Sequence, residues 1–181
     1  MSKFKENYRI ESNRLKNWNY SWKGLYFVTI NTKFFHNHFG EIINGDMKLS
    51  TLGNKVHEEW AKIPTIRPDM NIILDDFTIM PNHFHGIIGI DRNKHNTFRL
   101  ISNIDEILSE EESLSPNLFG PQRKNLGAII RGFKGAVTSF AKKNHILFNW
   151  HPRYYDKLIQ DEIALDNIRK YIRNNVNNWG K

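Results

Sequence analysis

The sequence predicts an α+β fold, with a ferredoxin-like central antiparallel sheet and helices packed mainly on one face. Three observations lead to this expectation. Strand-like and helix-like apolar spacings follow one another in the order β-α-β-β-α-β-α. Two of the strand-like segments are separated only by Pro81 and Asn82, which requires antiparallel pairing. The chain has 181 residues, 39% of them hydrophobic, which suits one compact domain burying about 70% of its unfolded surface.

The first four elements can be placed from local signals. Residues 25–32 read LYFVTINT, and this mixture of aromatic and β-branched side chains predicts a strand. A helix follows the capping residues Ser50 and Thr51 and ends before Pro64. Residues 70–80 and 83–91 predict two antiparallel strands. The inward face of the first helix contains Leu52, Val56 and Trp60.

The second half of the chain predicts two helices and one strand. Residues 122–144 form the clearest helical pattern, with an apolar face and a polar, largely basic stripe that includes Arg131 and Lys134. Residues 153–159 predict the last strand, and residues 162–178 the last helix. The apolar face of the first of these helices contains Leu126, Ile129, Ile130, Phe133, Val137 and Phe140. That of the last contains Leu165, Ile168, Ile172 and Val176.

We expect residues 1–181 to form a single domain with a variable insertion at residues 91–121. This stretch lacks sustained periodicity and contains Asn, Ser, Pro and Gly, with a short helix expected near residues 103–108. Five acids and no base lie between Asp105 and Glu112, so the rest of the chain is more basic than the formal net charge of +7. A basic body favours a polyanionic partner.

Composition excludes several classes of protein. The chain contains no cysteine, so disulfide scaffolds and thiolate zinc sites are excluded and a reducing compartment, the cytoplasm, is expected. The first twenty residues lack the apolar core of a signal peptide. No apolar run approaches the ~20 residues of a membrane span, so no membrane association is expected.

The segment MPNHFHGII at residues 80–88 is the most informative in the chain. On a strand, side chains alternate between faces, so His83 and His85 project together and Phe84 projects to the other side. Neutral imidazole is the commonest protein metal ligand, and a strand fixes the spacing of such a pair. The alternative is two partly exposed sheet histidines that hydrogen-bond to their neighbours.

Tyr171 and Asn175 are four residues apart on the last predicted helix and therefore share a face. If this face lies over His83 and His85, a phenol, an amide oxygen and two imidazoles surround one point. Such a site suits a divalent ion that polarises a phosphodiester while a tyrosine oxygen attacks phosphorus. Nearby positive charge must favour the phenolate, because a protonated tyrosine hydroxyl is a poor nucleophile. The alternative for Tyr171 is a half-buried tyrosine at the helix edge.

The His83-Phe84-His85 segment resembles the His-hydrophobic-His motif of single-tyrosine HUH transposases, particularly the REP-associated tyrosine transposases. The resemblance covers roughly residues 14–179. Beyond the motif it is carried by YFVTINT, FGEIINGDMKLSTLG with the following EEW, LGAIIRGFKGAVTSF, NWHPRYYDKLIQDE and IRKYIRNN. One departure is Asn175-Val176, where relatives commonly have Asn-Pro, so the helix is expected to continue further here.

The resemblance implies a metal-dependent single-strand DNA endonuclease and strand transferase that forms a covalent 5′-phosphotyrosine intermediate. By this match Tyr171 takes the nucleophile position, while His83, His85 and Asn175 take the metal-ligand positions. It also implies Mg²⁺ or Mn²⁺ as cofactor, single-stranded, hairpin-forming DNA as partner, and a homodimer. Imidazole ligands alone would also admit zinc or other transition metals.

Five further residues are candidate DNA contacts. Arg131 and Lys134 could neutralise phosphates, although a basic helical stripe is usually a solvated face. Arg153, Tyr154 and Tyr155 offer a cation and rings for stacking on unpaired bases, and alternation along a strand predicts that one of the two tyrosines faces inward. Two other functions stay open from the residues alone: a non-catalytic nucleic-acid-binding protein, and a metallohydrolase in which activated water attacks.

Overall fold

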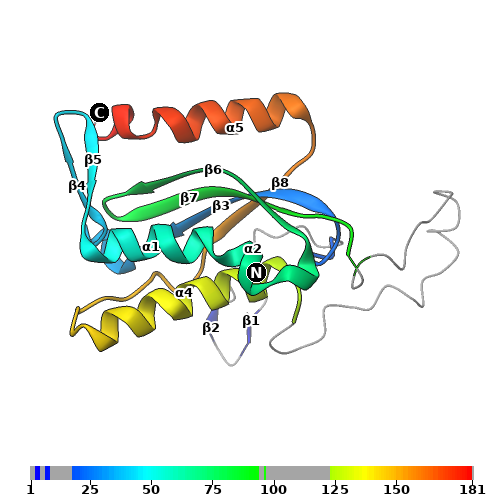
Figure 1. Cartoon of the computed structure of the whole chain (residues 1–181), viewed down its shortest axis with the longest axis horizontal. Helices are drawn as coiled ribbons and strands as arrows, with labels where there is room; N and C mark the ends of the chain where they lie inside the picture. Colours follow the sequence, from blue (N-terminus) through cyan, green and yellow to red (C-terminus); the bar gives the residue numbers. More distant parts are fainter. Residues whose placement is uncertain (1–2, 5–6, 9–17, 94–95, 97–122, 181) are drawn as a thin grey trace, which may run out of the picture.

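The structure is a computed structural model and describes residues 3–4, 7–8, 18–93, 96 and 123–180 (Figure 1). The predicted insertion at residues 91–121, with its short helix and acidic segment, lies outside these residues except for residues 91–93 and 96. Within the described chain, no helix combines the length and apolar character needed to cross a membrane.

A four-stranded antiparallel sheet forms the centre of the fold. Its strands are β3 (Gly24–Asn31), β6 (Ile72–Met80), β7 (His83–Ile90) and β8 (Tyr155–Ile159), arranged in the order β6-β7-β3-β8. Every pair of neighbours is antiparallel. With the helices between them, these strands reproduce the predicted β-α-β-β-α-β-α order and confirm the ferredoxin-like arrangement.

Helices cover both faces of this sheet (Figure 1). One face carries α1 (Thr51–Ala61), α2 (Ile63–Ile66) and α4 (Leu126–Lys143), and the opposite face carries α5 (Glu162–Asn174). The expectation of helices mainly on one face is therefore confirmed. Because side chains alternate along β7, even-numbered residues from 84 to 90 face α1 and α4, and odd-numbered residues face α5.

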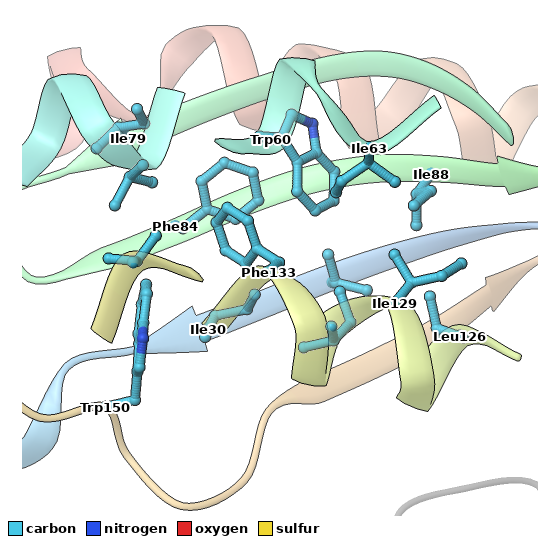
Figure 2. Close-up of a cluster of buried hydrophobic side chains, with 14 of the residues drawn as sticks. Ile30, Trp60, Ile63, Ile79, Phe84, Ile88, Leu126, Ile129, Phe133 and Trp150 are labelled. Atoms are coloured by element: carbon cyan, nitrogen blue, oxygen red, sulfur yellow. The ribbon is translucent and has the colours of Figure 1, made fainter. Parts of the chain in front are cut away.

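The larger core lies between the sheet and the α1/α4 layer (Figure 2). The ring of Phe84 lies 4.6 Å from that of Trp60 and 5.6 Å from that of Phe133, measured between centroids. Gly86 is required beside them, because a Cβ atom there would come within 2.8 Å of both the Phe84 and the Trp60 rings. This packing confirms the inward faces predicted for the helices that correspond to α1 and α4.

A smaller core attaches α5 to the opposite face. Phe27, Ile87 and Ile159 of the sheet pack against Ile172 of α5, with Leu165 and Ile168 beside them. Three of the four inward residues predicted for the last helix therefore pack as expected, and Val176 lies beyond the end of α5.

Two arginines of α5 also bind consecutive carboxylates of β6. Arg169 donates from Nε and Nη2 to the two oxygens of Asp75 at 2.9 and 2.6 Å, and Arg173 Nε donates to Asp76 at 2.6 Å. A bulge between Leu74 and Phe77 inserts one extra residue into β6 relative to β7, so that both carboxylates face α5. These ion pairs fix α5 over the sheet.

Side-chain caps set where the helices begin. Ser50 Oγ accepts from Gly53 N at 3.0 Å at the start of α1, as predicted. Asn125 Oδ1 accepts from Ala128 N at 2.9 Å, so α4 begins at Leu126 and the predicted start at residue 122 was too early. The last helix ends at Asn174 and continues only as a 3-10 turn, Val176–Asn178.

The sequence reasoning missed a hairpin between β3 and α1. Strands β4 (Gly40–Ile43) and β5 (Asp46–Leu49) form a separate two-stranded sheet. They are joined by Asn44 and Gly45, which have φ angles of 54° and 84°. Short paired segments β1 (Lys3–Phe4) and β2 (Asn7–Tyr8) and the 3-10 turns η1 (Lys33–Phe35) and η2 (Pro68–Met70) were also not predicted.

Candidate functional site

His83 and His85 lie side by side on the α5 face of β7, with ring centroids 4.6 Å apart. His85 is only 5% exposed. Burial and, secondarily, the neighbouring His83 lower the pKa of His85 from 6.5 to about 3. Burial also lowers the pKa of His83, opposed by a side-chain hydrogen bond with Asn175 that favours the protonated ring. Both imidazoles are therefore neutral near pH 7, the form in which they bind metals.

Neighbours on two elements fix the orientation of His85. Its Nδ1 is 2.8 Å from Oγ1 of Thr29, the residue opposite it on β3, and its Nε2 is 3.2 Å from the Tyr171 hydroxyl. Its ring stacks on Phe27 at 5.4 Å. When Nδ1–H donates to Thr29, Nε2 keeps its lone pair and points it toward Tyr171.

His83 is held in a similar way from the turn before β7. Its Nδ1 lies 2.7 Å from Oδ1 of Asn82, an acceptor, so the Nδ1 proton is donated there and Nε2 keeps a lone pair. Asn82 Nδ2 in turn donates to the carbonyl oxygen of Phe35 at 3.0 Å. The Asn175 side chain lies beside His83 and so connects this ring to the end of α5.

Tyr171 stands at the edge of α5, with 49% of its surface exposed. Its ring packs edge-on against His85 at 5.2 Å and against Phe27 at 6.0 Å. Asn175 caps the C-terminus of the same helix one turn later. The structure therefore brings Tyr171, Asn175, His83 and His85 together, the two histidines from β7, Tyr171 from α5 and Asn175 from the C-cap of that helix.

The donors of this cluster fit a divalent metal ion. In the part of the chain that the structure describes, no three His, Cys, Asp or Glu side chains are grouped to hold one. A third protein ligand beside the two imidazoles must therefore be of another type, and the neutral amide oxygen of Asn175 is in contact with His83. Two neutral imidazole nitrogens, each oriented by a hydrogen-bond partner, and one amide oxygen form an acceptable donor set.

The candidate DNA contacts from the last strand divide between the two faces. Tyr155 is paired with Thr29, which is paired with His85, so these three side chains form one row across the α5 face. Tyr155 is exposed, whereas Tyr154 packs against the larger core. The expectation that one of the two tyrosines faces inward is confirmed. Arg153 is exposed just before β8.

The basic residues of α4 are not brought to this site. Arg131 and Lys134 belong to the helix layer on the opposite face of the sheet (Figure 1). Lys134 Nζ donates to the carbonyl oxygens of His151 at 2.7 Å and Arg153 at 3.4 Å, and burial lowers its pKa from 10.5 to about 8. Lys134 thus holds the segment before β8, and phosphate contacts by either residue stay a prediction.

Sequence reasoning missed the residues that hold the site together. Thr29 could have been found, because it precedes the end of the first predicted strand on the same face as Phe27. Asn82 directly precedes the histidine motif, and its position in the predicted turn is the signal that places it beside His83. The ion pairs of Asp75 and Arg169 carried no local signal, because 94 positions separate them.

Comparisons with known proteins show which folds and sequences this chain resembles. No family model matches the chain. Among solved structures it is similar to a REP-associated tyrosine transposase bound to a REP hairpin, with 13% identity and a TM-score of 0.54 over 96% of this chain and 75% of that one. The chain therefore has the fold of that transposase.

A relative found by sequence shows the family of the chain. The chain is 39% identical over 167 residues to an uncharacterized protein of Haemophilus influenzae, covering 92% of this chain and 87% of the relative. The chain belongs to the same family as this Haemophilus protein.

Proposed function

We propose that the protein is a metal-dependent single-strand DNA endonuclease and strand transferase that forms a covalent 5′-phosphotyrosine intermediate. The observation that carries the proposal is the 3.2 Å contact between the Tyr171 hydroxyl and Nε2 of a buried, neutral His85. A structural tyrosine could pack at this helix edge without its hydroxyl reaching an imidazole pair. Here the hydroxyl reaches His85, and the Tyr171 residue remains half-exposed to a polymer substrate.

His83, His85 and Asn175 would hold the metal, Mg²⁺ or Mn²⁺. When bound, such an ion supplies positive charge that polarises a phosphate oxygen and favours a phenolate. Between the two metals, imidazole nitrogens favour Mn²⁺, because Mg²⁺ prefers oxygen ligands and retained water. Thr29 and Asn82 orient the two rings, and when each Nδ1–H donates to its partner both rings keep an Nε2 lone pair for this purpose.

The chain's own groups account for the covalent step. The Tyr171 hydroxyl loses its proton to solvent, and its oxygen attacks phosphorus. A tyrosyl oxygen–phosphorus bond forms while the bond from phosphorus to the 3′ oxygen breaks. The leaving 3′ oxygen takes a proton from water and becomes a 3′-hydroxyl. One phosphodiester replaces another, so the reverse attack by a 3′-hydroxyl rejoins the strand without a nucleotide cofactor.

The partner is proposed to be single-stranded DNA that forms hairpins. The formal net charge of +7 suits a polyanion, and the solved neighbour is bound to a REP hairpin. We further propose that residues 1–181 form one catalytic domain, that it acts as a homodimer, and that it works in the cytoplasm.

A denaturing gel tests this function directly. Labelled hairpin oligonucleotides from the flanks of the gene are incubated with Mn²⁺ and either the wild-type protein, Tyr171→Phe or Tyr155→Phe. Tyr155 is the matched control, since it is an exposed tyrosine on the same face of the sheet. The expected result is a protein–DNA adduct with wild type and Tyr155→Phe, and none with Tyr171→Phe.

Other outcomes identify the alternatives. Cleavage without any adduct would indicate a metallohydrolase that uses activated water. Binding without cleavage would indicate a non-catalytic nucleic-acid-binding protein. An adduct of undiminished yield with Tyr171→Phe would reject Tyr171 as the nucleophile.

A further inference from the structure

Two adjacent phenylalanines are exposed in the turn that follows β3. Phe34 is 72% and Phe35 60% exposed, and both belong to η1. Single exposed apolar residues are ordinary, but two neighbouring bare aromatic rings on one short turn require an explanation. We refer to Phe34 and Phe35 as the aromatic turn.

The backbone of the aromatic turn is held in an unfavourable conformation. Phe34 and Phe35 have φ angles of 59° and 55°, in the left-handed region that bulky residues rarely adopt. Such a conformation persists only where surrounding contacts impose it, and it concentrates at functional sites. Here Thr32 Oγ1 donates to the carbonyl of His36 at 2.8 Å, and Lys33 N donates to the carbonyl of Asn149 at 2.8 Å.

One side chain connects the aromatic turn to the proposed metal site. Asn82 donates from Nδ2 to the Phe35 carbonyl at 3.0 Å and accepts at Oδ1 from His83 Nδ1 at 2.7 Å. In addition, the last residue of β3, Asn31, is paired with His83 across the sheet. The aromatic turn therefore leaves the sheet beside the first histidine, at the edge of the candidate site.

The surroundings of the aromatic turn suit a nucleic-acid strand. Lys33 Nζ lies 4.9 Å from the centroid of the Phe34 ring, which places a positive charge beside an open aromatic face. The ring centroid of His36 lies 6.0 Å from that of Phe34, and the ring centroid of His38 lies 5.9 Å from that of His36. Flat rings interleaved with a cation are the usual means of binding unpaired bases and their phosphates without hydrogen-bond readout.

We propose that Phe34 and Phe35 form a stacking platform for unpaired bases of the DNA strand whose phosphate is attacked at Tyr171. This inference rests on the proposed function, because it places the platform at the entrance to that site. Its occupant is a base rather than a phosphate, since the two rings offer apolar faces. The exposed rings remain bare in the free protein and become covered only when single-stranded DNA is bound.

Binding to two DNA hairpins tests the platform. One carries a single-stranded thymidylate arm, and the other carries an abasic arm of equal length with the same phosphates. Affinities are measured for Tyr171→Phe protein, which is not expected to cleave, with and without Phe34→Ala and Phe35→Ala. Ile66→Ala with Ile163→Ala is the matched control, as both side chains are exposed and belong to other elements.

The two phenylalanine replacements should lower affinity for the thymidylate arm by about fivefold or more for each base unstacked. Affinity for the abasic arm should stay unchanged, as should both affinities in the isoleucine control. Phe34→Trp with Phe35→Trp should retain thymidylate binding, because a larger ring stacks at least as well. Thermal melting of every variant checks that the fold is intact.

Several results would overturn the platform. Unchanged thymidylate affinity, or equal losses on the two arms, would show that these rings do not stack on bases. A change in sedimentation without a change in DNA binding would instead identify an interface between two copies of the chain. The adduct assay on wild-type protein tests the proposed chemistry separately. If the phenylalanine replacements weaken binding to the thymidylate arm but wild type forms no adduct, the stacking platform is supported and the covalent chemistry is rejected.

Discussion

Replacement of Thr29 by Val should weaken metal binding without unfolding the protein. Thr29 Oγ1 lies 2.8 Å from Nδ1 of His85, whose ring is too buried for water to substitute freely. Valine keeps the branched shape on β3 but removes the hydroxyl that holds Nδ1 of His85. The fold should lose about 1–3 kcal/mol for one unsatisfied buried nitrogen, which is an observable but tolerable fall in melting temperature.

The larger effect should be on metal affinity. Loss of a hydrogen bond that orients a ligand typically lowers affinity by about 10–100-fold, or roughly 1.4–2.8 kcal/mol. We expect calorimetry with Mn²⁺ to show a loss in this range for Thr29→Val and nearly normal affinity for Thr29→Ser, which retains the hydroxyl. Adduct yield at limiting Mn²⁺ should fall in parallel and recover as Mn²⁺ is raised.

The chain offers a matched control for this experiment. Thr78 lies opposite His85 on β6, on the other side from Thr29. Among the hydrogen bonds found in the described residues, Thr78 has none to His85. Thr78→Val should therefore leave metal affinity unchanged. Equal affinities for Thr29→Val, Thr78→Val and wild type would refute the idea that Thr29 prepares His85 as a ligand.

Three further predictions follow from the same structure. Replacing His83 and His85 together by Ala should abolish Mn²⁺ binding in calorimetry while DNA binding survives, because one amide oxygen cannot hold the ion alone. Arg169 holds the pKa of Asp75 below 3.8, so this pair should stabilise the fold above that pH and lose its effect as pH falls through the lowered value. In chemical unfolding, Asp75→Asn should therefore lose less stability than wild type as pH falls. The substitution should also lower adduct yield, because it loosens α5. Burial lowers the pKa of Lys134 from 10.5 to about 8. The free energy of unfolding of wild type should therefore rise relative to that of Lys134→Met as pH increases from about 8 toward 10.5. Parallel plots of unfolding free energy against pH for the two proteins would contradict this.

The elements that position the site were predictable to different degrees. The β7 strand and the shared face of His83 and His85 follow from alternation, which depends on sequence alone. An amphipathic stripe fixes which side of a helix is buried, but not which face of the sheet it covers, so the position of α5 opposite α4 was not determined. The contact of Tyr171 with His85 depends on that choice and on ion pairs between distant residues.

Some structural features that were not predicted from the sequence have recognisable sequence signals. Asn44-Gly45 is the strongest short-range indication of a hairpin, and it lies between two short alternating segments, yet β4 and β5 were not inferred. Apolar spacing alone predicts too early a start for α4, whereas Asn125, a preferred capping residue, marks the observed start at Leu126. The left-handed conformation of Phe34 and Phe35 had no such signal, since it is imposed by contacts from Asn82 and Thr32.

The bulge in β6 makes the length of this strand as important as its chemistry. Asp75 and Asp76 reach Arg169 and Arg173 only because one extra residue interrupts the alternation between Leu74 and Phe77. Deletion of either aspartate would restore regular pleating and leave a single carboxylate to hold α5, whereas Asp-to-Glu changes would keep both on the helix side. During divergence of the family, β6 should therefore tolerate substitutions more readily than insertions or deletions.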